Sequence, residues 1–245
     1  MTVKTTKQKG SKSIMRNVLV IGASGDVGRG ITSVLLEAGW NVIASARTSS
    51  RLEELRAAFA SNRLKLIQGD ISTEQGTRRL WQDASATVGS INAVIVAASA
   101  PASECPLFSW NEDALLQLMR DNVITHFNAA KCLIPELISG GTFIGIGGGM
   151  ADFIAPNSAH ISMCQASLRM MYQSLDMECR GKNLIIKELM IMSMVNGHSR
   201  QHIAEPNWIT DLEIGRHVLE ILQSPQNFPD TILKLKPSRK AKNIA

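Results

Sequence analysis

Hydrophobic residues fall in short continuous runs that alternate with helical patterns almost to the C-terminus. The runs lie at 18–22, 41–46, 64–70, 92–99, 142–148, 183–192 and 231–236. Apolar residues recur at three- and four-residue steps, as in a helix, around 22–38, 51–60, 74–87, 111–138, 157–179 and 211–222. Strands that are apolar on both faces and alternate with helices indicate a parallel sheet covered on both sides. We therefore predict a doubly wound α/β fold of about seven strands.

The alternation continues without an internal repeat, a low-complexity segment or a linker. A chain of 245 residues is long enough to bury one large core. We therefore expect a single domain over residues 14–236. The ends, 1–13 and 237–245, are polar and basic, and we expect them to be disordered.

The net charge of +5 at pH 7 comes from the two ends of the chain. Between Asn17 and Leu233 there are 16 basic and 21 acidic residues, a net charge of −5. The predicted domain is therefore acidic, which disfavours a nucleic-acid partner. Ten cations lie before Asn17 or after Leu233, with no acid among them: Lys4, Lys7, Lys9, Lys12, Arg16, Lys234, Lys236, Arg239, Lys240 and Lys242.

The remaining composition is that of an ordinary soluble protein. No apolar run reaches the length of a membrane span. The N-terminal cations are not followed by the apolar region of a secretory signal. The four cysteines, Cys105, Cys132, Cys164 and Cys179, have neither CxxC nor metal-ligand spacing. We expect reduced core thiols in a cytoplasmic protein without a metal site.

The first predicted turn carries glycines in GxxGxxG spacing, within GASGDVGRG (22–30). Glycines between a strand and a helix permit a tight turn, let the backbone approach a pyrophosphate and let the helix pack closely. The helix N-terminus then presents free N–H groups to the phosphates. We predict a Rossmann-type dinucleotide site; a tight turn that binds nothing is the alternative. The predicted contacts are Gly22, Ser24, Gly25, Asp26, Val27 and Gly28.

The end of the second predicted strand indicates which dinucleotide binds. A site specific for NAD(H) needs an acid there to accept from the ribose 2′-OH. This chain has Arg47 at that point and no carboxylate until Glu53. Because a cation suits a 2′-phosphate, NADP(H) is favoured over NAD(H). The alternative is that Arg47 is a solvated residue at a helix start.

With these motifs the chain resembles the short-chain dehydrogenase/reductase family over nearly its whole length. GDI (69–71) is similar to the motif whose acid and following residue contact the adenine, which implies Asp70 and Ile71. INAVIVAAS resembles the family strand ending in Asn-Asn-Ala-Gly, which implies cofactor contacts at Ala97, Ala98 and Ser99. LMRDNVITHFNAAKCLIPEL closely resembles the next helix and places Asn122 at the family's structural and catalytic asparagine.

The resemblance fails at the family's serine, tyrosine and lysine. In that family the tyrosine protonates the carbonyl oxygen, the lysine lowers the tyrosine pKa, and the serine hydrogen-bonds the substrate. Alignment of GGTFIGIGGGMA and QASLRMMYQSLDME places Gly148, Ile161 and Gln165 at these three positions, with the family's thirteen-residue step from the first to the second. Only Asn122 remains of the four catalytic positions.

Other residues near these positions are weaker candidates for proton transfer. Tyr172 lies eleven residues after Ile161, about 16 Å along a helix, so we expect a buried tyrosine with its hydroxyl satisfied. His160 is a candidate acid, with a surface or capping histidine as the alternative. His198 and His202 lie where the family covers the substrate, although loop histidines are usually solvated. For the run GIGGG (145–149) we weigh an anion-binding nest against a flexible strand end without side chains.

Three functions remain open. The first is an NADP(H)-binding protein with weak or no standard carbonyl reductase activity. The second is an NADP(H)-dependent oxidoreductase with another proton donor, His160 being the candidate, or with a substrate that needs none, such as an activated alkene. The third is a scaffold that binds neither cofactor nor substrate. The resemblance further implies a homodimer or homotetramer formed through the helices at 111–138 and 157–179.

Overall fold

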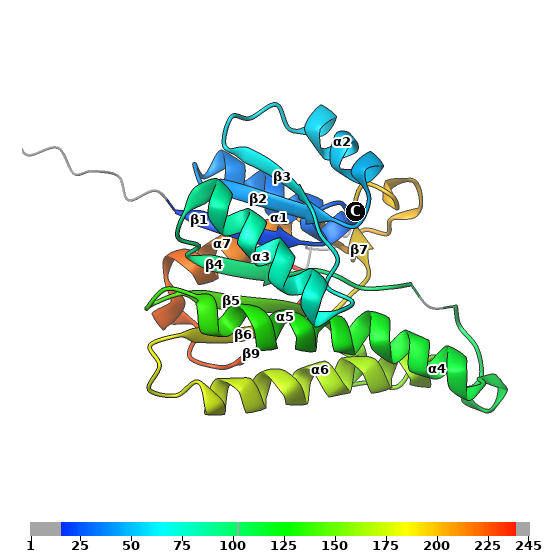
Figure 1. The fold of residues 1–245 in the computed structure, drawn as a ribbon. Helices are drawn as coiled ribbons and strands as arrows, with labels where there is room; N and C mark the ends of the chain where they lie inside the picture. Colours follow the sequence, from blue (N-terminus) through cyan, green and yellow to red (C-terminus); the bar gives the residue numbers. More distant parts are fainter. Residues whose placement is uncertain (1–15, 102, 239–245) are drawn as a thin grey trace, which may run out of the picture.

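A computed structural model describes residues 16–101 and 103–238 (Figure 1). The predicted disordered ends, 1–13 and 237–245, therefore lie outside the described residues except for Pro237 and Ser238. Ser238 donates a hydrogen bond from its Oγ to Glu213 at 3.2 Å. Among the described residues, no helix is both long and apolar enough to cross a membrane.

The described residues contain a seven-stranded sheet in the order β3-β2-β1-β4-β5-β6-β9, with every neighbouring pair parallel. Its chain order reverses between β1 and β4, which makes this the topological switch point of the sheet. The predicted seven-stranded fold is therefore confirmed. The strands are β1 (Asn17–Ile21), β2 (Asn41–Ala46), β3 (Leu64–Gln68), β4 (Ala93–Val96), β5 (Thr142–Gly148), β6 (Ile185–Ile191) and β9 (Ile232–Leu235).

Helices cover both faces of the sheet, as Figure 1 shows. Each face has its own core, because side chains alternate along the strands: Val18 and Val20 point into one, Leu19 and Ile21 into the other. The first core is covered by α1 (Asp26–Glu37), α2 (Ser49–Ala58) and α7 (Asp211–Gln223); the second by α3 (Glu74–Val88), α5 (Thr125–Leu133) and α6 (Ala159–Glu178).

The helix predicted over 111–138 is divided into several segments. α4 (Glu112–Met119) passes through a π-helical turn, Arg120–Ile124, into α5, and a 3-10 turn at Ile134–Glu136 follows. Asn122 lies inside the π turn. Its Nδ2 donates to the carbonyl of Leu118 at 3.0 Å, and its Oδ1 accepts the N–H of Ala100 at 3.0 Å. The side chain thereby ties the helix to the segment that leaves β4.

The segment between β6 and α7 contains a small parallel strand pair. β7 (Val195–Asn196) pairs with β8 (Ile209–Thr210), and residues 197–208 connect them. Thr210 then starts α7 through a capping box, in which its Oγ1 accepts from the N–H of Glu213 and that carboxylate accepts the N–H of Thr210.

Two glycines let α1 and α7 cross at close range. A Cβ atom at Gly30 would overlap the carbonyl oxygen of Asp211. A Cβ at Gly215 would lie 2.5 Å from the carbonyl oxygen of Gly30. Because backbone atoms cannot rotate away as the end of a long side chain can, the crossing excludes larger residues.

We predict that Gly30→Ala lowers the free energy of unfolding by about 1–3 kcal/mol, because the overlap outweighs the roughly 1 kcal/mol that alanine gains in helix propensity. Urea unfolding measures the change. Ser33→Ala on the same helix is the matched control and should change stability by less than about 0.5 kcal/mol. A Gly30→Ala variant as stable as the wild type would contradict the close crossing.

Candidate functional site

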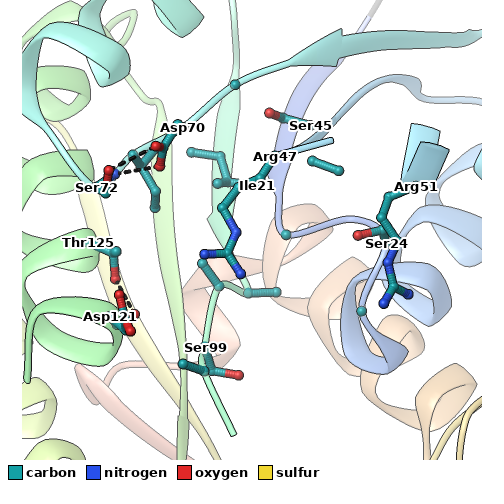
Figure 2. A pocket seen from close by; sticks show the side chains of 18 of the residues that line it. Ile21, Ser24, Ser45, Arg47, Arg51, Asp70, Ser72, Ser99, Asp121 and Thr125 are labelled. Atoms are coloured by element: carbon teal, nitrogen blue, oxygen red, sulfur yellow. Dashed lines mark hydrogen bonds between the residues drawn. The ribbon is translucent and has the colours of Figure 1, made fainter. Parts of the chain in front are cut away.

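A cavity of about 470 Å³ lies at the carboxyl edge of the sheet, at the switch point between β1 and β4. Its walls come from the segments that follow β1, β2, β3 and β4, from Asp121 in the π turn and from Thr125 at the start of α5. Figure 2 shows the side chains around it. In open parallel sheets, ligands bind at this place.

Most of the predicted cofactor residues line this one cavity. They come from four separate segments, which the parallel strands bring together at one edge: Gly22, Ser24, Gly25, Arg47, Asp70, Ile71, Ala97, Ala98 and Ser99. The sequence reasoning missed Ser45, Thr48, Arg51, Asp121 and Thr125, which also line it. Arg51 could have been found, since it lies four residues after Arg47 at the start of a predicted helix.

Three predicted cofactor residues do not line the cavity, for different reasons. Val27 packs against the first core. A Cβ at Gly28 would overlap the carbonyl oxygen of Gly22, so this glycine serves the close packing of α1 on the turn. Asp26 turns its carboxylate toward Ser199.

The turn before α1 presents backbone groups to the cavity. Gly22 has φ of +79°, which favours glycine, and a Cβ there would lie 2.7 Å from the carbonyl oxygen of Ala97. Gly25 is the N-cap of α1, and no side chain of the described residues forms a cap hydrogen bond there. The first N–H groups of α1 therefore lack a side-chain partner beside the cavity, an arrangement suited to an anion.

The end of the cavity near β2 and β3 is polar. Arg47 extends toward its middle, whereas Arg51 lies beside Ser24, across the cavity from Asp70 (Figure 2). Gln68 donates from Nε2 to the carbonyl oxygen of Arg47 at 2.9 Å, which fixes the backbone there. Asp70 accepts from the N–H and the Oγ–H of Ser72, both at 2.9 Å, which orients its carboxylate. Two cations and one oriented carboxylate thus line the cavity.

Two of the three positions that the alignment matches to the family's serine, tyrosine and lysine lie side by side in the structure. A Cβ at Gly148 would overlap Nε2 of Gln165, so the glutamine side chain occupies the space beside the strand end. Ile161 lies on the same helix, one turn before Gln165. Oε1 of Gln165 is buried and, among the described residues, accepts no hydrogen bond. No hydroxyl, phenol or ammonium group stands at these positions.

The glycine run of β5 is filled by side chains from neighbouring elements. Tyr172 of α6 occupies the space at Gly145, and the carboxylate of Glu188 on β6 occupies the space at Gly147. Neither interpretation of GIGGG holds, because side chains cover the strand end and leave neither an open nest nor an empty end.

Tyr172 is fully buried with its hydroxyl bonded, as predicted. His126 lies between it and the cavity wall, with Nε2 2.9 Å from the carbonyl oxygen of Ala98 and Nδ1 2.9 Å from the Tyr172 hydroxyl. A carbonyl only accepts, so Nε2 carries the proton and the tyrosine donates to Nδ1. Burial lowers the pKa of His126 to about 4, so the ring is neutral at physiological pH.

His160 does not occupy a place where a substrate can reach it. Its ring is fully buried and packs on Trp110, with 4.3 Å between ring centroids. The prediction of His160 as proton donor is therefore wrong for this conformation, and so is the surface or capping alternative. Cys164 is buried as predicted, and burial raises its pKa to about 11. His198 and His202 are exposed.

The carboxyl group of Glu188 is fully buried, and within the described chain neither oxygen has a hydrogen-bond partner. Burial raises its pKa to about 7, against the opposing charge of Arg169. Arg169 itself pairs with Asp152, which also accepts from Lys234. The region under the strand end therefore holds a carboxyl that keeps its proton at mildly acidic pH.

A second cavity, of about 450 Å³, adjoins the first and shares Ala100 and Asp121 with it. The loop after β4 and one side of α4 form its walls, among them Trp110 and Leu118. Cys105 also lines this cavity, so the prediction that all four cysteines are core residues is wrong for this one.

Comparison with known proteins places this geometry in context. A family model described as short chain dehydrogenase matches residues 16–205. An uncharacterized oxidoreductase of Staphylococcus aureus (strain MRSA252) is 23% identical over 162 residues, which span 65% of this chain and 70% of that protein.

Solved structures share the fold at low identity. ElxO with NADP bound superposes with a TM-score of 0.82 and 14% identity, over 90% of this chain and 97% of that one. A short chain oxidoreductase from Pseudomonas aeruginosa PAO1, described as containing an atypical catalytic center, superposes with a TM-score of 0.80 and 17% identity, over 92% and 98%. At such identities these two structures show the fold alone.

We predict that Glu188→Gln changes how stability depends on pH. The folded pKa of about 7 exceeds the ordinary value of 4.5, so the stability contributed by the protonated group is present below pH 4.5. This stability is lost as the pH rises from 4.5 to about 7, because in that range the unfolded chain gives up the proton while the folded chain keeps it. The variant should therefore gain up to about 3 kcal/mol relative to the wild type between pH 4.5 and pH 8.

Urea unfolding at the two pH values measures this difference. The unpaired amide of glutamine also changes the free energy of unfolding, but by an amount that does not depend on pH. The test is therefore whether the difference between variant and wild type changes from one pH to the other. Glu37→Gln, at an exposed carboxylate of α1, is the control and should show no such change. An identical offset at both pH values would contradict a buried, protonated Glu188.

Proposed function

The chain belongs to the short-chain dehydrogenase/reductase family, and we propose that it binds NADP(H) and has weak or no standard carbonyl reductase activity. One observation carries the proposal. A single cavity joins the glycine turn before α1, the two arginines after β2 and the residues after β3 and β4. The strand end where the family's proton donor would act has Gly148, Ile161 and Gln165 instead.

In the proposed complex the pyrophosphate lies at the N-terminus of α1. Gly22 and Gly25 let the phosphates approach the backbone, and the uncapped N–H groups of the first turn donate to them. Ser24 offers a hydroxyl at the same wall of the cavity. This part of the site binds either dinucleotide, since it contacts only what NAD(H) and NADP(H) share.

Arg47 and Arg51 would bind the 2′-phosphate, which favours NADP(H) over NAD(H). Guanidinium groups bind phosphate through paired, charge-assisted hydrogen bonds. Asp70 and Ile71, on the neighbouring segment, would border the adenine. ElxO, which shares the fold, was solved with NADP bound.

The nicotinamide end would lie against Ala97, Ala98 and Ser99. Asn122 keeps the segment after them in place through the N–H of Ala100, so we propose a positioning role for it. The cofactor supplies hydride when bound. The positions aligned with the family's serine, tyrosine and lysine would supply no group to protonate a carbonyl oxygen, and loss of general acid catalysis typically lowers rates by about 10²–10⁴.

The alternative is an active NADP(H)-dependent oxidoreductase whose substrate, such as an activated alkene, needs no standard proton donor. The second cavity supports it, because a substrate there would adjoin the cofactor cavity at Ala100 and Asp121. The Pseudomonas aeruginosa oxidoreductase that shares the fold is itself described as having an atypical catalytic center.

We also propose a homodimer or homotetramer through α4, α5 and α6. Exposed apolar side chains on these helices and the turn between them support it: Leu116, Ile124, Phe127, Met163, Met170 and Met177. On α6 they recur every seven residues and so form one stripe. We further propose that residues 14–236 form a single domain. The proposed location is the cytoplasm, which the four free thiols support.

We predict that Arg47→Ala and Arg51→Ala each weaken NADPH binding about 10–100-fold, the effect of losing a hydrogen bond to a charged group. NADH binding should change less than about threefold, because NADH has no 2′-phosphate. Isothermal titration calorimetry measures both. Arg56→Ala is the control. Arg56 lies on α2 with Arg51, but it pairs with Glu53 and does not line the cavity. Equal losses for NADH and NADPH would exclude a 2′-phosphate contact.

We predict that the combined change Gly148→Ser, Ile161→Tyr and Gln165→Lys creates NADPH-dependent reduction of small aldehydes, at least about 10²-fold above the wild type. Gln165 must change together with Gly148, because it occupies the space that a serine would enter. NADPH oxidation followed at 340 nm measures the rate. The pair Gly148→Ser and Gln165→Lys, which keeps Ile161, should stay inactive.

If the wild type reduced the same aldehydes as fast as the triple variant, the residues at these three positions would not be what limits carbonyl reduction. Unfolding curves of the three proteins establish that each variant is folded at the assay temperature.

A further inference from the structure

Asp26 is the first residue of α1, yet its carboxylate faces away from the cavity. Oδ1 accepts the backbone N–H of Ser199 at 2.8 Å, and Oδ2 accepts the Ser199 hydroxyl at 2.6 Å. Gly197 allows this approach, because a Cβ there would overlap the Cβ of Asp26. The contact joins segments 173 residues apart in the sequence.

This contact is the main tether of the segment between β7 and β8. In the part of the chain that the structure describes, residues 198–208 hydrogen-bond to other segments only through Ser199, and both bonds go to Asp26. The remaining hydrogen bonds of the segment are internal, such as those that form the 3-10 turn Gln201–Ile203. Ile203 is exposed and adds little buried area. Ala204 and Trp208 are half-buried, so packing also holds the segment, and the Asp26 carboxylate is its hydrogen-bonded anchor to the rest of the fold.

The same carboxylate lies at the helix end that would receive the pyrophosphate. Within the described residues, no lysine or arginine forms an ion pair with Asp26. A carboxylate free to turn toward the cavity would repel the phosphates. The two Ser199 donors turn it the other way and satisfy its oxygens.

We infer that Asp26 and Ser199 are positioning residues that couple docking of segment 197–208 to dinucleotide binding. The inference rests on the proposed function, since it requires a pyrophosphate at α1. With the segment docked, the carboxylate points away and NADPH binds more tightly. By linkage, bound NADPH stabilises the docked segment by the same factor.

A double-mutant cycle tests the coupling. We expect Ser199→Ala to weaken NADPH binding about 3–10-fold, because Asp26 then loses one donor and turns more freely. We expect Asp26→Ala to bind NADPH at least as tightly as the wild type. In the Asp26→Ala background, Ser199→Ala should change the Kd by less than about 1.5-fold. An equal loss in both backgrounds, or no loss in the wild-type background, would overturn the inference.

Amide hydrogen exchange supplies a second measurement, the first part of which needs no cofactor. Exchange in residues 198–208 should be faster in Ser199→Ala than in the wild type without NADPH, and NADPH should slow it in the wild type. Ser33→Ala is the matched control, because Ser33 Oγ also bonds a carboxylate of α1, Glu37, at 3.2 Å. This control should leave both the Kd and the exchange unchanged.

The two measurements separate the two possible failures. If the wild type binds no NADPH at millimolar concentration, the proposed function fails and the coupling with it, even if exchange responds to Ser199→Ala. If NADPH binds and the exchange of residues 198–208 does not respond to Ser199→Ala, the coupling alone is overturned.

Discussion

The candidate site depends on how closely α1 approaches the turn that follows β1. Gly28 packs against the carbonyl of Gly22, and Gly22 in turn packs against the backbone of Ala97 at the end of β4. A side chain at either glycine would push the helix or the neighbouring strand away. These contacts place the N-terminus of α1 over the carboxyl edge of the sheet, where its free N–H groups face the cavity. The arginines after β2 and the segments after β3 and β4 then complete the walls, because neighbouring parallel strands end at the same edge.

The opposite half of the site follows a different physical rule. β5 ends in glycines, and an interior packed to crystal-like density does not leave the resulting space empty. Tyr172, Glu188 and Gln165 occupy it from α6 and β6. Tyr172 and Glu188 are fully buried and Gln165 is half-buried, and all three fill space that the glycines leave. Under the proposed function, this division lets one chain bind a dinucleotide without the family's proton donor.

Much of the fold and half of the site could be predicted from the sequence, because strand and helix periodicity and the glycine turn are local patterns. The position of Arg47 at a strand end is local in the same way. The remaining features depend on partners far along the chain. The orientation of Asp26 is set by Ser199, and the environment of Tyr172 by His126 and Gly145. The glycine run was misinterpreted because its own sequence does not show which side chains fill the space beside it.

The central claim is that this chain has the binding half of the family's site. Calorimetric titration of the full chain with NADPH tests it most directly. We expect saturable binding at one site per chain, with a Kd on the order of micromolar and a higher Kd for NADH. The absence of any binding heat up to millimolar NADPH, with the protein shown to be folded, would contradict the claim.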